Sequence, residues 1–143
     1  MRCVDASILI AAGATNHPHH AQATRVLQPT GEALGLPSVA LSAFLRITTN
    51  RRALKDPATP GQSLAFVDAL LTHPDARVVN AGPRHWEIFR GLMGRYEARA
   101  DDIPDLYLAA IAIENAATWV SFDRGFARFR ELTWVNPLDA WPT

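Results

Sequence analysis

The chain has 143 residues, of which 48% are hydrophobic and 20% are charged, a profile typical of a folded globular domain. Fourteen basic residues balance fourteen acidic residues, so the net charge does not indicate bulk attraction to nucleic acid. Cys3 is the only cysteine, which excludes an internal disulfide, and no apolar run reaches the length of a membrane span. We therefore expect a single domain over residues 1–143, located in the cytoplasm and not associated with a membrane.

In the first part of the chain, short apolar runs alternate with helical patterns. "RCVDA" predicts a strand, and "SILIAAG" predicts a short helix that ends at Gly13. Residues 17–28 carry a moderate helical pattern, residues 32–38 a weak second strand, and residues 39–50 a helix. In this last helix the side chains expected to face the core are Leu41, Phe44, Leu45 and Ile47.

Two helices and a strand are predicted in the middle of the chain. A helix over residues 62–73 follows a loop rich in proline, and a third strand covers residues 76–81. Residues 83–98 predict an amphipathic helix with Pro83 at its start. The buried side chains expected in the two helices are Leu64, Val67, Leu70 and Leu71, and then Trp86, Phe89, Leu92 and Met93.

The last part of the chain begins with a predicted buried helix from Asp105 to Asn115. A strand, "TWVSF", follows it, then a short helical turn that begins around Phe126 and Phe129, and a final edge strand, "LTWVN". Strands that alternate with helices in this way are typical of an α/β fold with a mostly parallel sheet.

Three aspartates stand beside these elements. Asp5 follows the first strand, Asp123 follows "TWVSF", and Asp105 heads the helix that leads into that strand. Parallel sheets place functional residues beyond the carboxyl ends of their strands, so we expect the three carboxylates to converge. Because like charges repel, such a cluster needs a cation or shifted pKa values, and oxygen ligands favour Mg²⁺ or Mn²⁺. The alternative is that each aspartate only caps a helix.

Several sequence blocks carry a resemblance to a known family. The blocks are "VDASILI", "FLRITTN", "PRHWEIFRGL", "IPDLYLAAIAIENAATWVSFDRGFARF" and "LTWVNPL". In this order, and over essentially the whole chain, they resemble the PIN-domain ribonucleases, specifically the VapC-type toxins of bacterial toxin–antitoxin pairs. The resemblance implies a three-layer α/β/α fold, a metal-dependent endoribonuclease activity, a VapB-type antitoxin as inhibitor and a homodimer.

The resemblance also implies roles for individual residues. Asp5, Asp105 and Asp123 match the family's metal-binding and catalytic acids. Ser7 and Ser121 match small polar residues that accompany these acids. In the "FLR" helix, Arg46 matches an arginine that is common in this subgroup, and we expect it to contact RNA phosphates.

One position departs from the family pattern. PIN domains usually carry a glutamate on the helix that here reads "VALSAFLR", near Ala43, whereas residues 39–46 contain no acid. Asp102, three residues before Asp105, is a candidate substitute, and the alternative for Asp102 is a solvated loop acid. The departure leaves the strength of catalysis open, although it does not affect the expected fold.

We therefore expect Asp5, Asp105 and Asp123 to hold Mg²⁺, with Mn²⁺ as an alternative, for hydrolysis of RNA phosphodiesters. One rival is a catalytically weakened PIN domain that mainly binds its antitoxin. The other is a phosphohydrolase with Asp5 as nucleophile, but that chemistry usually needs an acid two residues further on and a lysine in the site. The chain has Ser7 at that position, and Lys55 is its only lysine.

Overall fold

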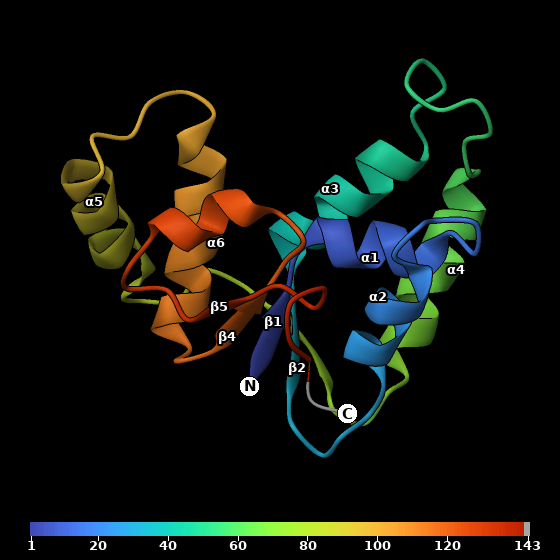
Figure 1. Ribbon diagram of the computed structural model, residues 1–143, viewed down its shortest axis with the longest axis horizontal. Coiled ribbons are helices and arrows are strands. Elements are labelled where there is room, and N and C mark those ends of the chain that lie inside the picture. The colour runs from blue at the N-terminus through green and yellow to red at the C-terminus, as the bar shows by residue number, and fades with distance from the viewer. Residues whose placement is uncertain (142–143) are drawn as a thin grey trace.

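The computed structural model describes residues 1–141, which form a parallel five-stranded sheet between two layers of helices (Figure 1). Its strands are β1 Arg2–Val4, β2 Leu34–Pro37, β3 Ala76–Val79, β4 Thr118–Val120 and β5 Trp134–Val135. The strand order is β3-β2-β1-β4-β5, and each neighbouring pair is parallel. The α/β class, the parallel sheet and the edge position of β5 are thus as predicted. The strand order reverses between β1 and β4, where α/β proteins place their functional residues.

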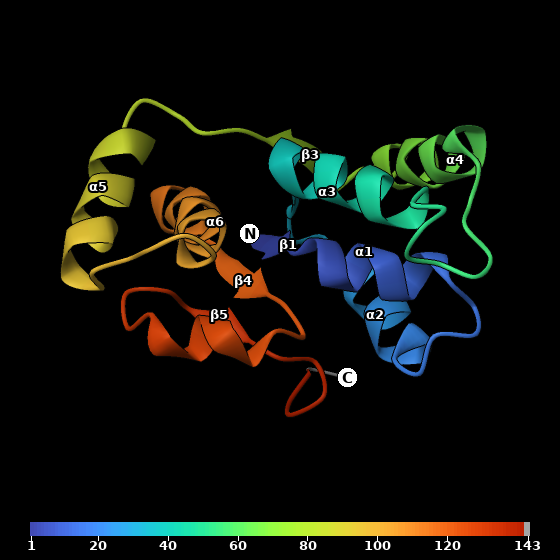
Figure 2. The same ribbon diagram turned by 90° about the horizontal axis from the view of Figure 1, so that it is seen from above.

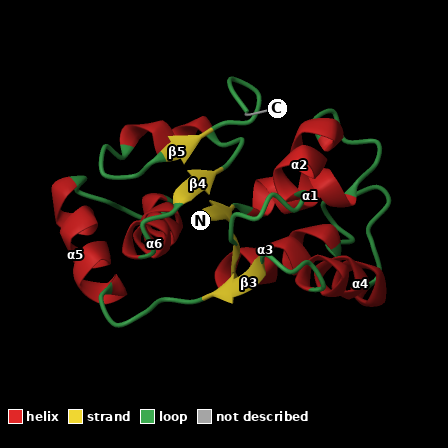
Figure 3. Ribbon diagram, turned by 90° about the horizontal axis from the view of Figure 1, so that it is seen from below, coloured by secondary structure: helices red, strands yellow, loops and turns green. Residues whose placement is uncertain are grey.

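The helices divide between the two faces of the sheet (Figures 2 and 3). One face is covered by α1 Ala6–Gly13, α2 His20–Leu27, α3 Ser38–Thr48 and α4 Pro60–Leu71. The other face is covered by α5 His85–Arg95, α6 Asp102–Glu114 and the 3-10 helix η1 Arg124–Arg128. This is the three-layer α/β/α arrangement expected from the sequence.

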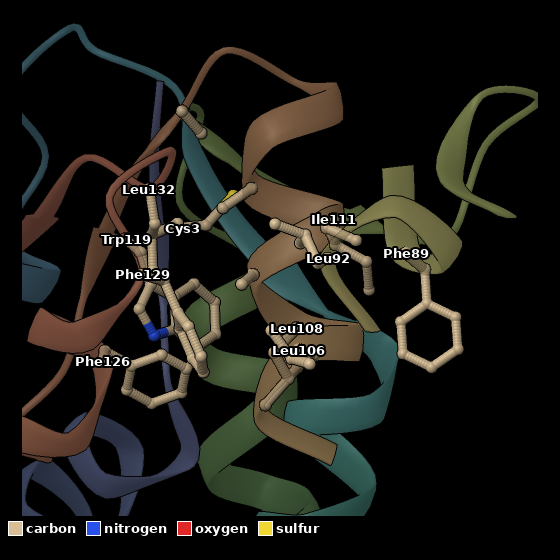
Figure 4. Close-up of a cluster of buried hydrophobic side chains, with 14 of the residues drawn as sticks. Cys3, Phe89, Leu92, Leu106, Leu108, Ile111, Trp119, Phe126, Phe129 and Leu132 are labelled. Atoms are coloured by element: carbon tan, nitrogen blue, oxygen red, sulfur yellow. The ribbon is translucent and has the colours of Figure 1, made fainter. Parts of the chain in front are cut away.

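Alternate residues of the two central strands supply the two cores. Cys3 and Trp119, both fully buried, pack in the cluster beneath α5 and α6. Val4 and Val120, one residue further on, pack in the cluster beneath α1 to α4. This alternation follows from the two-residue period of a strand. Figure 4 shows the aromatic rings beside Trp119 on one side of α6, with Phe89 on the other side.

The outer helices bury a different stripe from the one predicted. In α4 the buried residues are Ser63, Val67 and Leu70, whereas Leu64 is 48% exposed and Leu71 is 40% exposed. Each exposed leucine lies one residue, or about 100°, from the buried stripe. The predictions for Leu64 and Leu71 were therefore wrong by one helical position.

The same error affects α5. Its buried residues are His85, Phe89 and Leu92, and Trp86 is 65% exposed instead of buried. Helix α5 packs against α6, which covers only a narrow stripe of its surface. Trp86 lies at the edge of this stripe, where its ring centroid is 5.9 Å from that of Phe89. The helix begins at His85, two residues after Pro83. The residue pattern alone did not show which of two adjacent stripes the partner helix covers.

No helix among residues 1–141 is both long enough and apolar enough to cross a membrane.

The β1–β2–β3 packing gives a testable prediction at Gly35. A Cβ atom there would lie 2.5 Å from the Cys3 sulfur and 3.1 Å from Val79 Cγ2, closer than van der Waals contact allows. Gly35→Ala should therefore lower the free energy of unfolding by about 1–3 kcal/mol, because neither neighbouring strand can move away. Urea unfolding measures this change.

Gly91→Ala is the matched control, because it adds the same methyl group in the interior of α5, where nothing lies within 4 Å. It should stabilise the protein by about 0.5–1 kcal/mol, the usual difference between alanine and glycine in a helix. A Gly35→Ala variant as stable as wild type would contradict the described packing of β1, β2 and β3.

Candidate active site at the carboxyl ends of β1 and β4

The register of the two central strands brings Asp5 and Ser121 together. Val4 pairs with Val120, so Asp5 and Ser121 leave neighbouring strands at the same level. The Asp5 amide donates to the Val120 carbonyl at 3.0 Å, which continues the ladder by one residue. Both side chains therefore project from the carboxyl edge of the sheet at the point where the strand order reverses.

The Asp5 carboxylate accepts three hydrogen bonds. Its Oδ1 accepts from the Ala6 amide at 2.8 Å, so Asp5 is the N-cap of α1, as the capping alternative predicted. Its Oδ2 accepts from the Ser121 hydroxyl at 2.6 Å and from the Ser7 hydroxyl at 3.0 Å. Capping therefore uses one carboxylate oxygen, and two hydroxyl groups orient the other.

Ser121 also links Asp5 to Asp123. The fully buried Ser121 hydroxyl accepts from the Asp123 amide at 3.0 Å while it donates to Asp5. Asp123 Oδ1 accepts from the Gly125 amide at 2.8 Å, which makes Asp123 the N-cap of η1. Ser7 supports the same turn, because its hydroxyl accepts from the Phe122 amide at 3.3 Å. The two serines thus fix the backbone that presents Asp123.

Asp105 does not cap its helix. Helix α6 begins at Asp102, three residues before the predicted start, and its N-cap residue is Asp101. Asp105 therefore lies within the first turn, and the capping alternative is wrong for this residue. Its Oδ2 accepts from Arg128 Nη2 at 3.3 Å, and 28% of the side chain is exposed.

The charges of Asp5 and Asp123 act on neighbouring carboxylates. Burial raises the pKa of Asp5, hydrogen bonds from Ser121, Ser7 and the Ala6 amide oppose this, and the charge of Asp123 raises it further. Burial also raises the pKa of Asp105, and the charges of Asp123, Asp5 and Asp102 raise it further. The positive charge of Arg128 lowers the pKa of Asp105 and so opposes this increase. Asp5, Asp105 and Asp123 come from three separate parts of the chain, and the charges of Asp5 and Asp123 both act on Asp105.

This cluster has the donor chemistry for a hard divalent cation but not a closed set of ligands. Within residues 1–141, no three His, Cys, Asp or Glu side chains form a ready-made metal site. However, no partner in the described part of the chain donates a hydrogen bond to Asp105 Oδ1 or Asp123 Oδ2. Carboxylate oxygens that repel one another fit Mg²⁺ or Mn²⁺.

Two other predicted residues lie differently. Asp102 Oδ1 is 3.2 Å from Arg128 Nη2, and its Oδ2 accepts from the Arg99 amide at 3.2 Å, so both oxygens are engaged.

Arg46 is exposed on α3 and lines a groove of about 270 Å³ between α3 and α4. It has no hydrogen bond or ion pair with the carboxylates of the described chain. Ala43, where the family's glutamate was expected, is half-buried on α3.

Sequence reasoning missed Arg128. This arginine contacts both Asp102 and Asp105, yet it lies in the block "DRGFARF", which we read only for Asp123 and the phenylalanines. Its distance of five residues from Asp123 was the only available signal. An ion pair between η1 and α6 depends on how the two helices pack.

The chain matches a family model and several curated proteins. The family model described as "PIN domain" covers residues 2–132. Ribonuclease VapC43 from Mycobacterium tuberculosis is 45% identical over 142 residues, which span 97% of this chain and 97% of VapC43. Ribonuclease VapC31 from the same organism is 36% identical over 144 residues, which span 96% of this chain and 99% of VapC31.

Solved structures of lower identity share the fold. M. tuberculosis VapC20, described as a sarcin-ricin loop cleaving toxin, has a TM-score of 0.67 at 18% identity and covers 92% of this chain and 98% of its own. VapBC-1 from nontypeable Haemophilus influenzae has a TM-score of 0.69 at 15% identity, and the match covers 96% of this chain and 98% of the VapBC-1 chain. At these identities the likeness establishes the fold alone.

The raised pKa of Asp5 predicts how stability depends on pH. A carboxyl group with a raised pKa in the folded state stabilises the protein below its ordinary value of 3.8, and this stabilisation is lost as the pH rises through the raised pKa. Asp5→Asn keeps a side-chain oxygen for the cap but removes the titration. In metal-free buffer, its unfolding free energy should therefore increase relative to wild type as the pH rises above 3.8.

Urea unfolding at several pH values, with a chelator present, measures this difference. Asp101→Asn is the control, because the Asp101 side chain makes no capping hydrogen bond. An Asp5→Asn difference from wild type that does not change with pH would contradict the raised pKa of Asp5.

Proposed function

Since this chain belongs to the PIN-domain family, and within it to the VapC proteins, we propose that it is an endoribonuclease that acts as the toxin of a toxin–antitoxin pair. The observation that carries the proposal is the position of Asp5 and Asp123 at the strand-order reversal, linked through Ser121, with the charges of both acting on Asp105. Relatives named as ribonucleases, at 45% and 36% identity over nearly their whole length, support the same activity.

We assign these three aspartates to a Mg²⁺ site, with Mn²⁺ as the alternative ion. When bound, such an ion would make water nucleophilic near neutral pH and neutralise charge on the phosphate oxygens. Asp105 and Asp123 offer carboxylate oxygens without hydrogen-bond partners in the described chain, and Asp5 offers a carboxylate in a fixed orientation. These residues would hold the ion, and the proposed substrate is an RNA phosphodiester.

Ser121 and Ser7 serve the site by orienting Asp5. Both hydroxyls donate to the same oxygen, Oδ2, so the carboxylate cannot rotate without breaking two hydrogen bonds. Ser121 also holds the Asp123 amide, so one side chain fixes the relative position of two acids. Groups that orient the ligands of a metal commonly change affinity or activity when they are removed.

The proposal extends to partners and location. Solved structures with this fold include VapBC-1, and another, from Klebsiella pneumoniae, is described as a toxin–antitoxin complex. We propose a VapB-type antitoxin as inhibitor, a homodimeric toxin, and contact between RNA phosphates and Arg46. A cytoplasmic location is part of the proposal, because RNA is found there and the buried Cys3 has no disulfide partner.

The absence of an acid from residues 39–46 is the ground for one alternative, a weakened enzyme that mainly binds its antitoxin, but the relatives named as ribonucleases do not favour it. The phosphohydrolase alternative fits less well. Both Asp5 oxygens accept hydrogen bonds, which makes this carboxylate a poor nucleophile, and Lys55 lies in the exposed loop between α3 and α4. Retained antitoxin binding without RNA cleavage would favour the weakened enzyme. A phosphoryl group on Asp5 would favour the phosphohydrolase.

Asp105→Asn should remove both metal binding and RNA cleavage. Loss of one charged ligand from an oxygen-only site should reduce cleavage by at least about a hundredfold, with little change in melting temperature, because the side chain is partly exposed. Calorimetric titration of Mn²⁺ and gel analysis of a labelled RNA measure the two losses. Cleavage products should carry a 5′-phosphate.

Asp101→Asn, which neutralises an acid four residues away at the same helix end, is the matched control and should bind metal and cleave RNA as wild type does. Full cleavage by Asp105→Asn would exclude the assigned role of Asp105. Cleavage lost in both variants would point to a general electrostatic effect of the α6 terminus.

Ser121→Ala should weaken metal binding and cleavage by about 10–100-fold, the range found when a group that orients a metal ligand is removed. Ser7→Ala should have a smaller effect, because its hydroxyl lies 3.0 Å from Asp5 instead of 2.6 Å. Metal affinity and cleavage rate are measured in parallel, together with melting temperature. Wild-type affinity and cleavage in Ser121→Ala would show that Asp5 does not need this orientation.

A further inference from the structure

Arg128 stands between two acids at the start of α6. Its Nη2 lies 3.2 Å from Asp102 Oδ1 and 3.3 Å from Asp105 Oδ2, so a single nitrogen contacts two carboxylates. The two acids come from the first turn of α6, and the arginine is the last residue of η1. This contact therefore connects the helix after Asp123 to the helix that carries Asp105.

A third contact holds the guanidinium in place. Its central carbon lies 4.6 Å from the centroid of the Phe129 ring, within the range of a cation–π interaction. Phe129 is 2% exposed, and its ring also packs edge-on against Tyr96 and Phe126. The ring that supports Arg128 is thus part of the core, and the arginine is held on two sides.

Arg128 is also the positive charge that acts on Asp105. The charges of Asp123, Asp5 and Asp102 all disfavour ionisation of Asp105, and Arg128 alone among the charges that affect it has the opposite effect. Among residues 1–141, Asp5 and Asp123 form no salt bridge. The compensation that Arg128 provides therefore falls on Asp102 and Asp105, and Asp105 is the one of these two acids that the proposed ion would also need.

We infer that Arg128 is a built-in counter-cation of the carboxylate cluster: its guanidinium holds Asp105 in the metal-free protein and competes with a divalent cation for that carboxylate. This inference rests on the proposed function, because it concerns the same cluster. The competition is limited, since Arg128 is 44% exposed and Asp105 is 28% exposed, and exposed ion pairs contribute little. Arg128 lowers metal affinity without preventing binding.

A neighbouring arginine provides the matched control. Arg124 is the first residue of the same 3-10 helix, but both its terminal nitrogens donate to the Asp139 carboxylate, each at 2.8 Å. It therefore has the same charge near the site, without contacting Asp102 or Asp105. A general effect of positive charge would affect both arginine variants alike, whereas competition for Asp105 would affect Arg128 variants alone.

The test is calorimetric titration of Mn²⁺ into wild type, Arg128→Ala and Arg124→Ala at one ionic strength. Arg128→Ala should bind Mn²⁺ about two- to fivefold more tightly than wild type, the range expected when one exposed competing ion pair is removed. Arg124→Ala should bind within about twofold of wild type. Adding Mn²⁺ should also raise the melting temperature of Arg128→Ala more than that of wild type.

A second measurement follows the arginine directly. Mg²⁺, which is diamagnetic, should shift the side-chain Nε–H resonance of Arg128 in a ¹⁵N spectrum, as the guanidinium leaves Asp105. The Arg124 resonance should not move. Arg128→Ala also identifies the resonance by its disappearance.

The outcomes separate this inference from the proposed function. Saturable Mn²⁺ binding of equal or lower affinity in Arg128→Ala, compared with wild type, would overturn the competition and leave the metal site standing. No Mn²⁺ binding in any of the three proteins would overturn both the metal site and the competition. An equal increase in Mn²⁺ affinity in Arg128→Ala and Arg124→Ala would show a general effect of positive charge and would overturn the specific role of Arg128.

Discussion

The site depends on one hydrogen bond, from the Ser121 hydroxyl to Asp5 Oδ2 at 2.6 Å, which joins residues 116 positions apart in the chain. The pairing of β1 with β4 makes this bond possible, because it brings the two residues to the same level at the edge of the sheet. The same hydroxyl accepts from the Asp123 amide, so the position of η1 follows from it. Through η1, it also affects where Arg128 meets α6.

The charges of the three acids oppose one another, and the fold contains groups that limit this cost. Burial and neighbouring acids raise the pKa of Asp5 and of Asp105. Ser7, Ser121 and the Ala6 amide stabilise the Asp5 charge, and Arg128 stabilises that of Asp105. The sheet edge holds Asp5 and Asp123, and the first turn of α6 holds Asp105. Asp105 caps nothing, so capping does not account for its position.

Much of this arrangement could be predicted from the sequence, because it follows from the ends of strands. Asp5 and Asp123 directly follow apolar strand patterns, and parallel strands bring their carboxyl ends to one edge. The errors arose where a residue's surroundings depend on a partner element. Trp86 and Leu64 lie one helical position from the buried stripes, and the residue pattern alone did not distinguish the two stripes. Arg128 was missed because its ion pairs depend on how η1 packs against α6.

We propose that Asp5, Asp105 and Asp123 together form a divalent-cation site, which can be tested by anomalous X-ray diffraction from crystals of the protein soaked in Mn²⁺. An anomalous peak is expected within coordination distance of all three carboxylates, with the Arg128 guanidinium withdrawn from Asp105. A well-diffracting crystal with no peak there, and with Arg128 still paired to Asp105 at saturating Mn²⁺, would contradict this proposal.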